Sequence, residues 1–415
     1  MVIIQTNEGG KSRVPTCRVP HWVYVVGNSL VFVIFFFYLQ SACRRMPNAK
    51  FFSTISIKRD DFLPKLNVTA NGTISTTNLL EGIFPKPDGT KDYNLVKERN
   101  TSSFNAFSFY VMGDTPYRDW QETRLQLQIS EMKKYVKKNP DRNLSFTVHV
   151  GDTQKVSRTN CIEPGYINTA SLLRKGPLPT LVVPGDNDWY CCPNRTESFR
   201  YFQENFGTLE TRWHKKDYEP LGIVRSVDNP ELFVFYKEGI LIIGLHLINA
   251  PLEDEDIRLW DARMKVNKEW VARNIESYFQ KREIRGVILL GHSLRSPRTR
   301  PFFLAVSEYF LNITHRENIP VLYQHGDGHN WDVDTKLSHQ IHWKHFRDIQ
   351  VDQGGLADPI IVDIAAQKGG KMKGLKPRND LEVVFGSGLF RIDRQRGQYK
   401  NPKRITELEK VTTKT

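Results

Sequence analysis

The stretch that decides the fold is Ser145-Phe-Thr-Val-His-Val150, which is followed directly by Gly151-Asp152-Thr153. Its apolar and β-branched residues predict a buried strand, and Gly-Asp ends that strand where a carboxylate can project from the edge of a sheet. In open α/β sheets, ligands bind at this carboxyl edge of the strands. Asp and Gly are also ordinary turn residues, so the stretch gains meaning only if the pattern recurs.

The pattern does recur, because four further apolar runs end in Asp, His or both. They are residues 107–112 before Gly113-Asp114, 180–184 before Gly185-Asp186-Asn187-Asp188, 286–290 before Gly291-His292, and 320–324 before His325-Gly326-Asp327-Gly328-His329. Carboxylates and imidazoles are the side chains that hold divalent metals in proteins. We therefore expect five buried strands to deliver ligands at the same end, as α/β proteins do when they assemble a metal centre.

Hydrophobic periodicity fills in the elements between these motifs. It predicts helices at 120–136, 198–206 and 260–279, and a further buried strand at 240–247. Helix 120–136 lies between the first two motifs and completes a βαβ unit. Four short strands are expected to close a second sheet, at 340–345, 359–364, 381–385 and 389–392. The predicted fold is an α/β protein with a two-sheet β-sandwich flanked by helices.

Length and charge limit the classes of protein that fit. The chain has 415 residues, 39% of them hydrophobic, which suffices for one large domain with extensions. Its net charge of +13 suits anionic surroundings or substrates. Much of the excess lies near the C-terminus, where residues 396–415 are expected to form a basic tail. No zinc-finger spacing, RNA-binding signature or heptad run is present, so we expect no nucleic-acid partner.

The N-terminal region predicts a membrane anchor. Residues 1–20 are polar, and Trp22 to Leu39 is an almost uninterrupted apolar run within the predicted segment 21–43. A helix of that length, rising about 1.5 Å per residue, nearly spans a bilayer core of about 30 Å. We expect an uncleaved signal anchor and a single-pass membrane protein. A cleaved signal peptide and a buried helix of the folded domain are the alternatives. Basic residues flank both ends, so charge does not decide the orientation.

Residues 44–103 are rich in Ser, Thr, Asn, Gly and Pro and predict a stalk or lead-in, with the folded domain at 104–395. Two features place that domain in the secretory lumen or outside the cell. Cys161 follows the second motif, and Cys191 and Cys192 follow the third, so a disulfide from Cys161 to Cys192, or else to Cys191, is expected. Six glycosylation sequons predict a glycoprotein, at Asn67, Asn71, Asn100, Asn143, Asn194 and Asn312.

The ordered series of motifs resembles the calcineurin-like metallophosphoesterases, whose motifs run Gly-Asp-x-His, Gly-Asp, Gly-Asn-His-Asp/Glu, Gly-His and Gly-His-x-His. The resemblance covers roughly residues 107–334, and the order of the five motifs makes it specific. Gly-Asp-Asn-Asp-Trp and His-Gly-Asp-Gly-His are similar to a divergent branch that has Gly-Asp-Asn-Asp/Glu-Trp in the third motif. The resemblance implies the four-layer calcineurin-like phosphoesterase fold.

The same resemblance implies two divalent metal ions, either Fe, Zn or Mn. On that basis Asp152 bridges the two ions and Asp114 binds the first. His329 matches the last His of the family pattern and completes the first ion's site. His292 belongs to the second ion, and Asp186 stands where the family has its Asn ligand. An Asp there adds negative charge, which tightens the binding of a divalent ion.

The sequence departs from the family pattern at three places. Pro116 stands where the first motif has a His ligand, so the first metal loses a nitrogen. Asp327 stands where the last motif has its first His, and either Asp327 or the neighbouring His325 is expected to serve the second metal. Asn187 occupies the place of the His that assists the leaving group, and an amide cannot act as a general acid. His246, at the end of its strand, is a candidate replacement.

The resemblance therefore implies a metal-dependent hydrolase of phosphate monoesters or diesters, with a metal-bound hydroxide as the nucleophile. The alternative is a catalytically weak or inactive protein of the same fold that binds a ligand or partner, which Pro116 and Asn187 favour. The expected partners are a phosphorylated substrate and, through the N-terminal helix, a membrane. Nothing in the sequence predicts a protein partner.

Overall fold

The computed structural model describes residues 103–248, 257–294, 296–313, 316–334 and 336–400. The predicted anchor at 21–43 and residues 44–102 of the predicted lead-in lie outside these ranges, as do residues 401–415. Within the described ranges, no helix combines the length and the apolar character needed to cross a bilayer.

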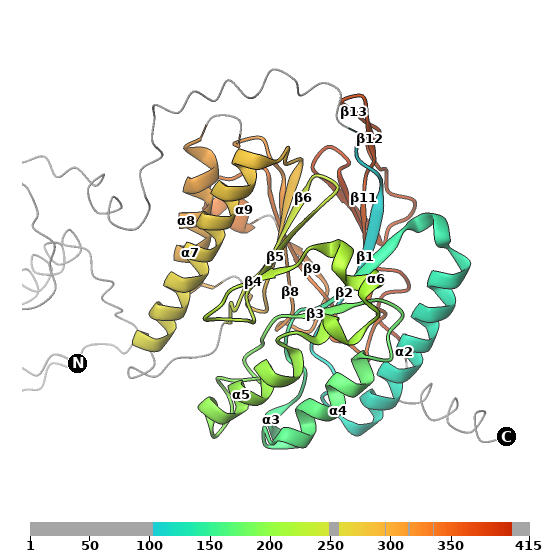
Figure 1. Ribbon diagram of the computed structural model, residues 1–415, viewed down its shortest axis with the longest axis vertical. Coiled ribbons are helices and arrows are strands. Elements are labelled where there is room, and N and C mark those ends of the chain that lie inside the picture. The colour runs from blue at the N-terminus through green and yellow to red at the C-terminus, as the bar shows by residue number, and fades with distance from the viewer. Residues whose placement is uncertain (1–102, 249–256, 295, 314–315, 335, 401–415) are drawn as a thin grey trace, which may run out of the picture. The chain divides into compact units, whose positions relative to one another are not determined.

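The five motif strands are all formed, but they divide between two sheets (Figure 1). The first sheet has six strands in the order β14-β15-β11-β1-β2-β3. Their bounds are Glu382–Phe385, Phe390–Asp393, Ile360–Ile364, Phe107–Met112, Leu144–His149 and Thr180–Val182. Strands β1, β2 and β3 run parallel to one another, whereas β11, β15 and β14 extend the sheet in antiparallel pairs.

The second sheet has seven strands in the order β4-β5-β6-β7-β8-β10-β9. Their bounds are Val224–Arg225, Phe233–Lys237, Ile240–Gly244, Gly286–Leu290, Val321–His325, Phe346–Gln350 and Asp332–Asp334. Strands β6, β7, β8 and β10 are parallel to one another. Strands β12 (Gln367–Lys368) and β13 (Lys371–Met372) form a separate two-stranded sheet.

Alternation along the strands builds the layers. In β1, Phe107, Phe109 and Val111 enter a core shared by both sheets, whereas Tyr110 and Met112 face the helices. The shared core also takes side chains from β5, β7, β8 and β11 of the two sheets, so the sheets pack face to face. A strand that is buried on both faces needs a continuous apolar run, which is why the motif strands were recognisable.

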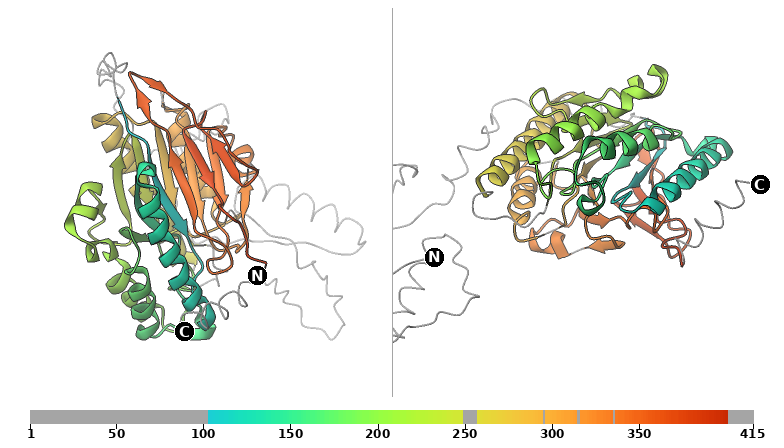
Figure 2. Two further views of the ribbon diagram at one scale, coloured as in Figure 1. Left: turned by 90° about the vertical axis from the view of Figure 1, so that its right-hand side faces the viewer. Right: turned by 90° about the horizontal axis from the view of Figure 1, so that it is seen from below.

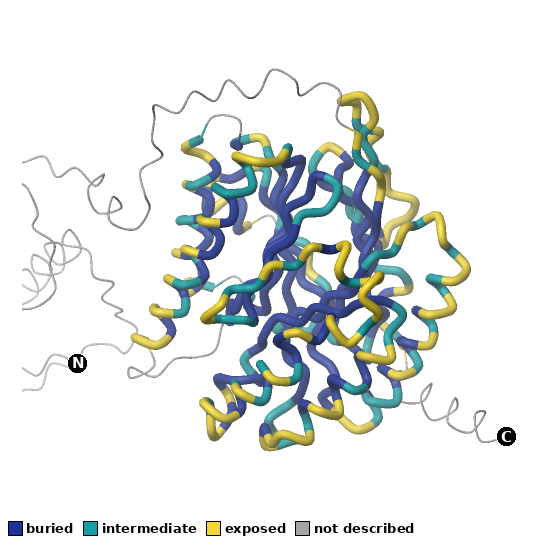
Figure 3. The backbone as a smooth tube through the Cα atoms, viewed as in Figure 1, coloured by how far each residue is buried: buried dark blue, intermediate teal, exposed yellow. Residues whose placement is uncertain are grey.

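Helices cover the outer face of each sheet (Figure 2). The first sheet packs on α2 (Asp119–Lys138), α4 (Glu163–Leu173) and α5 (Arg195–Phe206). The second packs on α7 (Ile257–Lys281), α8 (Arg300–Leu311) and Leu337 of α9 (Lys336–Gln340). The short helical turns are α3 (Val156–Thr159), η4 (Pro140–Arg142), η5 (Leu209–Arg212), α6 (Lys215–Tyr218) and η6 (Glu219–Leu221). Buried residues run through the centre, and exposure is concentrated on the outer helices (Figure 3).

Two sequence predictions about the C-terminal strands were wrong. Residues 340–345 do not form a strand, because α9 ends at Gln340 and the chain turns there, with Trp343 N–H donating to the Ser338 carbonyl at 2.8 Å. Ile341 and Trp343 are buried, but they lie in this turn. A short apolar run does not distinguish a buried turn from a buried strand. Strands β11, β14 and β15 also join the first sheet next to β1 and do not close a second one.

The start of the predicted basic tail is attached to the folded body. Arg396 forms an ion pair with Asp358 at 2.5 Å and another with Glu131 at 2.8 Å. The Tyr399 N–H donates to the Leu356 carbonyl at 2.8 Å. Residues 396–400 are therefore part of the domain surface, and the rest of the predicted tail lies outside the described residues.

Candidate metal site

The site forms where the carboxyl ends of the two sheets meet. Asp114, Asp152 and Asp186 follow β1, β2 and β3 of the first sheet, whereas His292 follows β7 and His329 follows β8 of the second. The backbone at Asp114, Asp152 and His329 is left-handed, with φ of 56°, 58° and 64°. This backbone conformation is uncommon for residues other than glycine, and it turns the chain sharply at the end of each strand. Tight turns of this kind bring the side chains of separate strands together.

The glycines of the Gly-Asp pairs allow these loops to touch. A Cβ atom on Gly151 would lie 2.7 Å from Nδ1 of His292, and one on Gly185 would lie 2.1 Å from Oδ1 of Asp152. Neither approach leaves room for a side chain. The glycines therefore permit close approach of the turns in addition to ending the strands.

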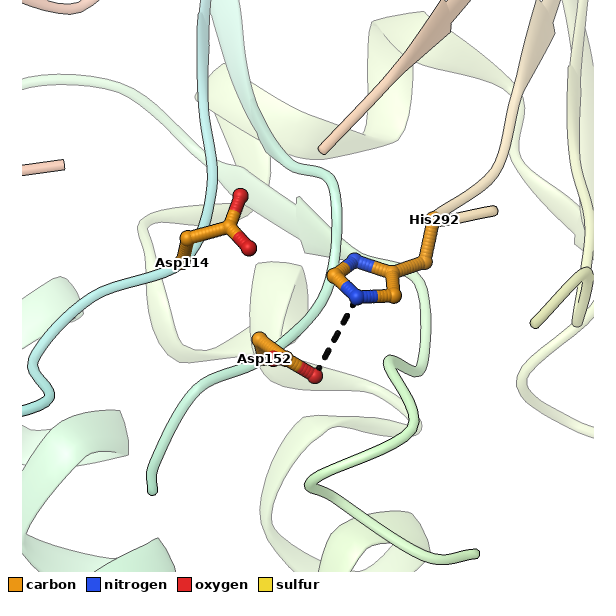
Figure 4. A group of neighbouring side chains, drawn as sticks. All are labelled: Asp114, Asp152 and His292. Carbon is orange, nitrogen blue, oxygen red and sulfur yellow. Dashed lines mark ion pairs between the residues drawn. The ribbon is translucent and has the colours of Figure 1, made fainter. Parts of the chain in front are cut away.

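Two overlapping groups of side chains could hold a metal ion. Asp114, Asp152 and His292 offer ligand atoms that lie within 4.8 Å of one another, and so do Asp186, His292 and Asp327. Figure 4 shows the first group, in which Nε2 of His292 lies 3.3 Å from Oδ1 of Asp152. Nδ1 of His292 lies 2.8 Å from the Val150 carbonyl oxygen, to which its N–H donates. That hydrogen bond fixes the ring so that Nε2 faces the carboxylates.

His329 lies at the rim of the first group. Its side chain is 38% exposed, and its Nε2 lies 3.4 Å from Oδ1 of Asp114. The same Asp114 oxygen accepts the Asp327 N–H at 3.1 Å, so the loop after β8 is attached directly to the loop after β1. His329 and Asp114 therefore stand side by side, as the family pattern implies for ligands of one ion.

Asn187 points its amide into the cluster. Its Nδ2 donates to Oδ2 of Asp152 at 2.5 Å and to Oδ1 of Asp186 at 3.0 Å, and its backbone N–H donates to Oδ1 of Asp152 at 3.0 Å. The residue is 7% exposed. An amide at this position can donate hydrogen bonds but has no proton to transfer at ordinary pH.

His325 lies outside both ligand groups, whereas Asp327 belongs to the second. Its Nε2 lies 2.8 Å from Oδ1 of Asp348, and its ring stacks on Tyr323 with centroids 5.0 Å apart. Residues two apart on a strand share a face, so His325 points with Tyr323 toward the helices of the second sheet. The structure therefore brings Asp327, and not His325, together with Asp186 and His292.

His246 is enclosed away from the ligand groups. It is 0% exposed, its Nδ1 lies 3.3 Å from Glu231, and its ring packs against Trp189 and Phe199. Burial, with a contribution from Arg263, lowers the pKa of His246 to about 4, so the imidazole is neutral near pH 7. This environment does not support the role of general acid that the sequence suggested for it.

Asp188 organises the site, although no role was predicted for it. Its carboxylate accepts the backbone N–H groups of Asp152, Thr153 and Gly185 at 2.8, 2.9 and 2.9 Å. Burial raises its pKa to about 6. Asp188 therefore fastens the loop after β2 to the loop after β3. The pair of acids in Gly185-Asp-Asn-Asp188 was the available signal, but sequence alone does not tell which of the two faces the cluster.

Tyr117 is a second residue of the cluster for which the sequence predicted no role. Its hydroxyl contacts Oδ2 of Asp152 in a short hydrogen bond, lies 3.1 Å from Oδ1 of Asp114, and lies 3.3 Å from Nε2 of His329. An aromatic residue three positions after a Gly-Asp turn carries no distinctive sequence signal, so only the folded chain reveals it.

The cluster carries more negative than positive charge. Burial raises the pKa of Asp152 well above its usual range, with Asp186 and Asp114 adding to the shift. Burial works in the opposite direction on His292, but Asp152 and Asp114 outweigh it and raise its pKa to about 10. Oδ2 of Asp114 and Nε2 of His292 are buried and have no hydrogen-bond partner among the described residues. Carboxylates in excess and ligand atoms without donors suit a divalent cation.

The structure forms the Cys161–Cys192 disulfide, with a Cα–Cα distance of 5.8 Å, and leaves Cys191 as an exposed free thiol. The disulfide connects the loop after β2 with the loop after β3. Sγ of Cys192 lies 3.3 Å from the carbonyl oxygen of Asn187, so this crosslink supports the backbone of the third motif.

No protein-family model matches the chain, and no curated protein matches it. Among solved structures, a 5'-nucleotidase from Candida albicans SC5314 is similar at 13% identity and a TM-score of 0.40 over 76% of this chain and 59% of that one. GAP50, the anchor in the inner membrane complex of Plasmodium, has 11% identity and a TM-score of 0.39 over 64% and 85%. The NAD nucleotidase of Haemophilus influenzae has 13% identity and a TM-score of 0.34 over 75% and 56%.

The matches span less than two thirds of either nucleotidase, and likenesses at this level assign no function. The functional argument rests on the chain itself. In the order of its motifs, its paired sheets and the convergence of its Asp and His side chains, the chain resembles the calcineurin-like metallophosphoesterases.

Proposed function

We propose that the protein is a metal-dependent hydrolase of phosphate esters. The observation that carries this proposal is the pair of overlapping Asp/His groups that share His292 at the joined ends of the two sheets. Structural carboxylates are usually paired with Arg or Lys, whereas these are crowded together, and Oδ2 of Asp114 has no donor among the described residues. Such an arrangement is costly unless a cation is bound.

Two divalent ions are proposed, and the residues fall into two sets. Asp114, Asp152 and His329 would hold the first ion, and Asp186, His292 and Asp327 would hold the second, with Asp152 between them. Bound ions of this kind activate water at neutral pH and offset the charge of a phosphate. Fe, Zn and Mn all accept carboxylate and imidazole ligands, so the donor set admits each of them.

The chain's own residues limit which esters would react. Asn187 would donate its amide hydrogens to a phosphate oxygen in place of the carboxylates that it contacts now. It cannot protonate a leaving group, and the enclosed His246 does not replace it. Esters whose leaving group needs no protonation should therefore be the better substrates, and an alkyl ester should lose the 10²–10⁴-fold that a positioned acid supplies, to order of magnitude.

We also propose the compartment and the anchor that the sequence predicts. The disulfide supports an oxidising compartment. Asn143, Asn194 and Asn312 are exposed, which glycosylation requires, although glycosylation itself stays a prediction. The single-pass membrane anchor at 21–43 stays a prediction as well.

The proposal is tested by metal analysis of the purified protein together with hydrolysis of nitrophenyl phosphate and bis-nitrophenyl phosphate. Turnover should require metal and should fall by at least about 100-fold in Asp152→Asn, since even residues behind the ligands contribute about 10–100-fold. Asp217→Asn, an exposed carboxylate on α6, is the matched control and should leave the rate unchanged.

Turnover that survives both chelation and Asp152→Asn would refute the metal mechanism. If the protein binds metal and hydrolyses no ester, the alternative of a binding protein with this fold holds. The absence of a titratable donor at Asn187 is the observation that favours this alternative.

A further inference from the structure

The phenolic hydroxyl of Tyr117 lies among the residues proposed for the first metal. It contacts Asp152 in a short hydrogen bond, lies 3.1 Å from Oδ1 of Asp114 and lies 3.3 Å from Nε2 of His329. These three residues are the whole set proposed for that ion. Among the described residues, no other hydroxyl contacts all three.

The first metal also lacks the histidine ligand for which Pro116 is substituted in the loop after β1. Pro116 has no side-chain donor, so Asp114, Asp152 and His329 leave the ion with fewer protein ligands than the four of a closed tetrahedral site. Tyr117 follows Pro116 directly, and its oxygen is an additional donor from the same loop. We infer that the phenolic oxygen of Tyr117 is a ligand of the first metal ion. This inference rests on the proposed function, because it concerns the same site.

The side chain is held in place for such a role. Tyr117 is 8% exposed, and its backbone N–H donates to Oε1 of Gln121 at 2.7 Å. Its ring packs edge-on against His329 with centroids 5.3 Å apart, and Nζ of Lys155 lies over its face at 4.8 Å. A ring fixed on both sides presents its oxygen in one direction only, which lowers the entropic cost of binding.

A hydroxyl placed between two carboxylates also explains the metal-free arrangement. One phenolic proton there reduces the repulsion between Asp114 and Asp152. On binding a metal ion, Tyr117 would release its phenolic proton to solvent, and the electron pair of the O–H bond would be shared with the ion. Metal binding by protein donors releases protons in this way.

The test uses Fe(III), because a phenolate bound to Fe(III) absorbs visible light and carboxylates and imidazoles do not produce that band. The full chain is titrated with Fe(III) while visible absorption and bound iron are measured. The wild type should develop the band in proportion to bound iron. Tyr117→Phe should lose at least about 90% of the band per bound iron and bind iron about 10–100-fold more weakly, the loss expected near a metal site.

Tyr236→Phe is the matched control, because the Tyr236 hydroxyl donates to the Glu283 carbonyl at 3.0 Å and belongs to β5, away from the site. It should keep both the band and the affinity. Circular dichroism checks that Tyr117→Phe is folded. If it is not, fluorotyrosine incorporated into the otherwise unchanged chain should shift the band.

Three results would overturn the inference. The first is a wild type that binds iron without the band, and the second is a folded Tyr117→Phe that keeps the band. The third is a fluorotyrosine protein whose band is unshifted. Each of these leaves the metal site itself standing. A wild type that binds no metal would instead refute the proposed function, and the inference with it.

Discussion

The first sheet carries two clusters of carboxylates that the fold treats in opposite ways. One is the strand-end cluster already described, and the other surrounds Asp363 on β11. Asp363 forms ion pairs of 2.8 Å with both Arg142 and Arg391 and accepts the Ser108 hydroxyl at 2.6 Å. In the strand-end cluster, every ion pair among the described residues is made with His292 or His329.

The pKa values of Asp363, Asp152 and Asp327 follow this difference. Asp114 is the exception, because burial is outweighed there by His329 and His292, which lower its pKa. Burial opposes ionisation of Asp363, but the hydrogen bonds from Arg142 and Ser108 outweigh it and lower its pKa. Burial raises the pKa of Asp152 and Asp327, and neighbouring carboxylates add to the effect. A buried carboxylate that arginines neutralise stabilises the fold, whereas crowded carboxylates that share only histidine partners can accept a metal ion. Among the described residues, arginine partners therefore distinguish the Asp363 cluster from the strand-end cluster, which we propose binds metal.

The largest expected effect follows from adding a titratable donor to the strand-end cluster. Asn187→His should speed the hydrolysis of alkyl phosphates by up to about 10²–10⁴-fold, because a positioned imidazole can protonate the leaving group. Nitrophenyl esters, which need no protonation, should gain little. Steady-state rates on the two classes of ester measure the difference, and Asn187→Gln is the control that keeps an amide. Equal gains on both classes would contradict the role assigned to Asn187.

A smaller effect is expected when the arginine-paired cluster is broken. Asp363→Asn should lower the free energy of unfolding by about 3 kcal/mol, since it leaves two largely buried arginines short of a partner. Metal binding should be unchanged. Because the pKa of Asp363 is lowered in the folded state, its contribution is present above the unfolded value of about 3.9 and is lost as the pH falls through the folded value.

Urea unfolding of the wild type and Asp363→Asn at neutral and acid pH measures this change. The difference in free energy of unfolding between the two proteins should become smaller as the pH is lowered. If this difference in free energy of unfolding is constant across the pH range, the ion pairs of Asp363 are not its cause.

The smallest effect has the opposite sign and is the sharpest check of the comparison. In metal-free protein at neutral pH, burial of the Asp327 charge and its repulsion by Asp186 and Asp114 are unfavourable. Asp327→Asn should therefore raise the free energy of unfolding by about 1 kcal/mol, the size of the repulsion between two unit charges about 4 Å apart in water. The pKa of Asp327 is raised in the folded state, so its charge destabilises the fold once the pH exceeds the unfolded value of about 3.9.

The increase in free energy of unfolding caused by Asp327→Asn should therefore become larger from acid to neutral pH. When metal is added, the variant should become less stable than the wild type, because it binds the ion more weakly. Thermal unfolding with and without chelator measures both. If Asp327→Asn destabilises the metal-free protein as Asp363→Asn does, the two clusters do not differ in the way described here.

Part of the fold and of the candidate site could be predicted from the sequence, because it depends on local residue patterns. The motif strands were predictable because a strand buried on both faces requires a continuous apolar run, as in β1 and β7. The convergence of several of their Asp and His residues was predictable because Gly-Asp and Gly-His end those runs. The Cys161–Cys192 disulfide was predictable because both cysteines follow neighbouring motifs, although Cys191 remained as an alternative.

The sequence by itself thus determined which residues stand at the ends of the buried strands. Only the tertiary structure decided which of them meet, because that depends on pairings between distant segments. It placed β11 beside β1, turned His325 toward Asp348, enclosed His246 beside Glu231 and brought the Tyr117 hydroxyl to Asp152. Strand alternation is a local property that a sequence carries, whereas the partner across a sheet or a loop is set by packing of the whole chain.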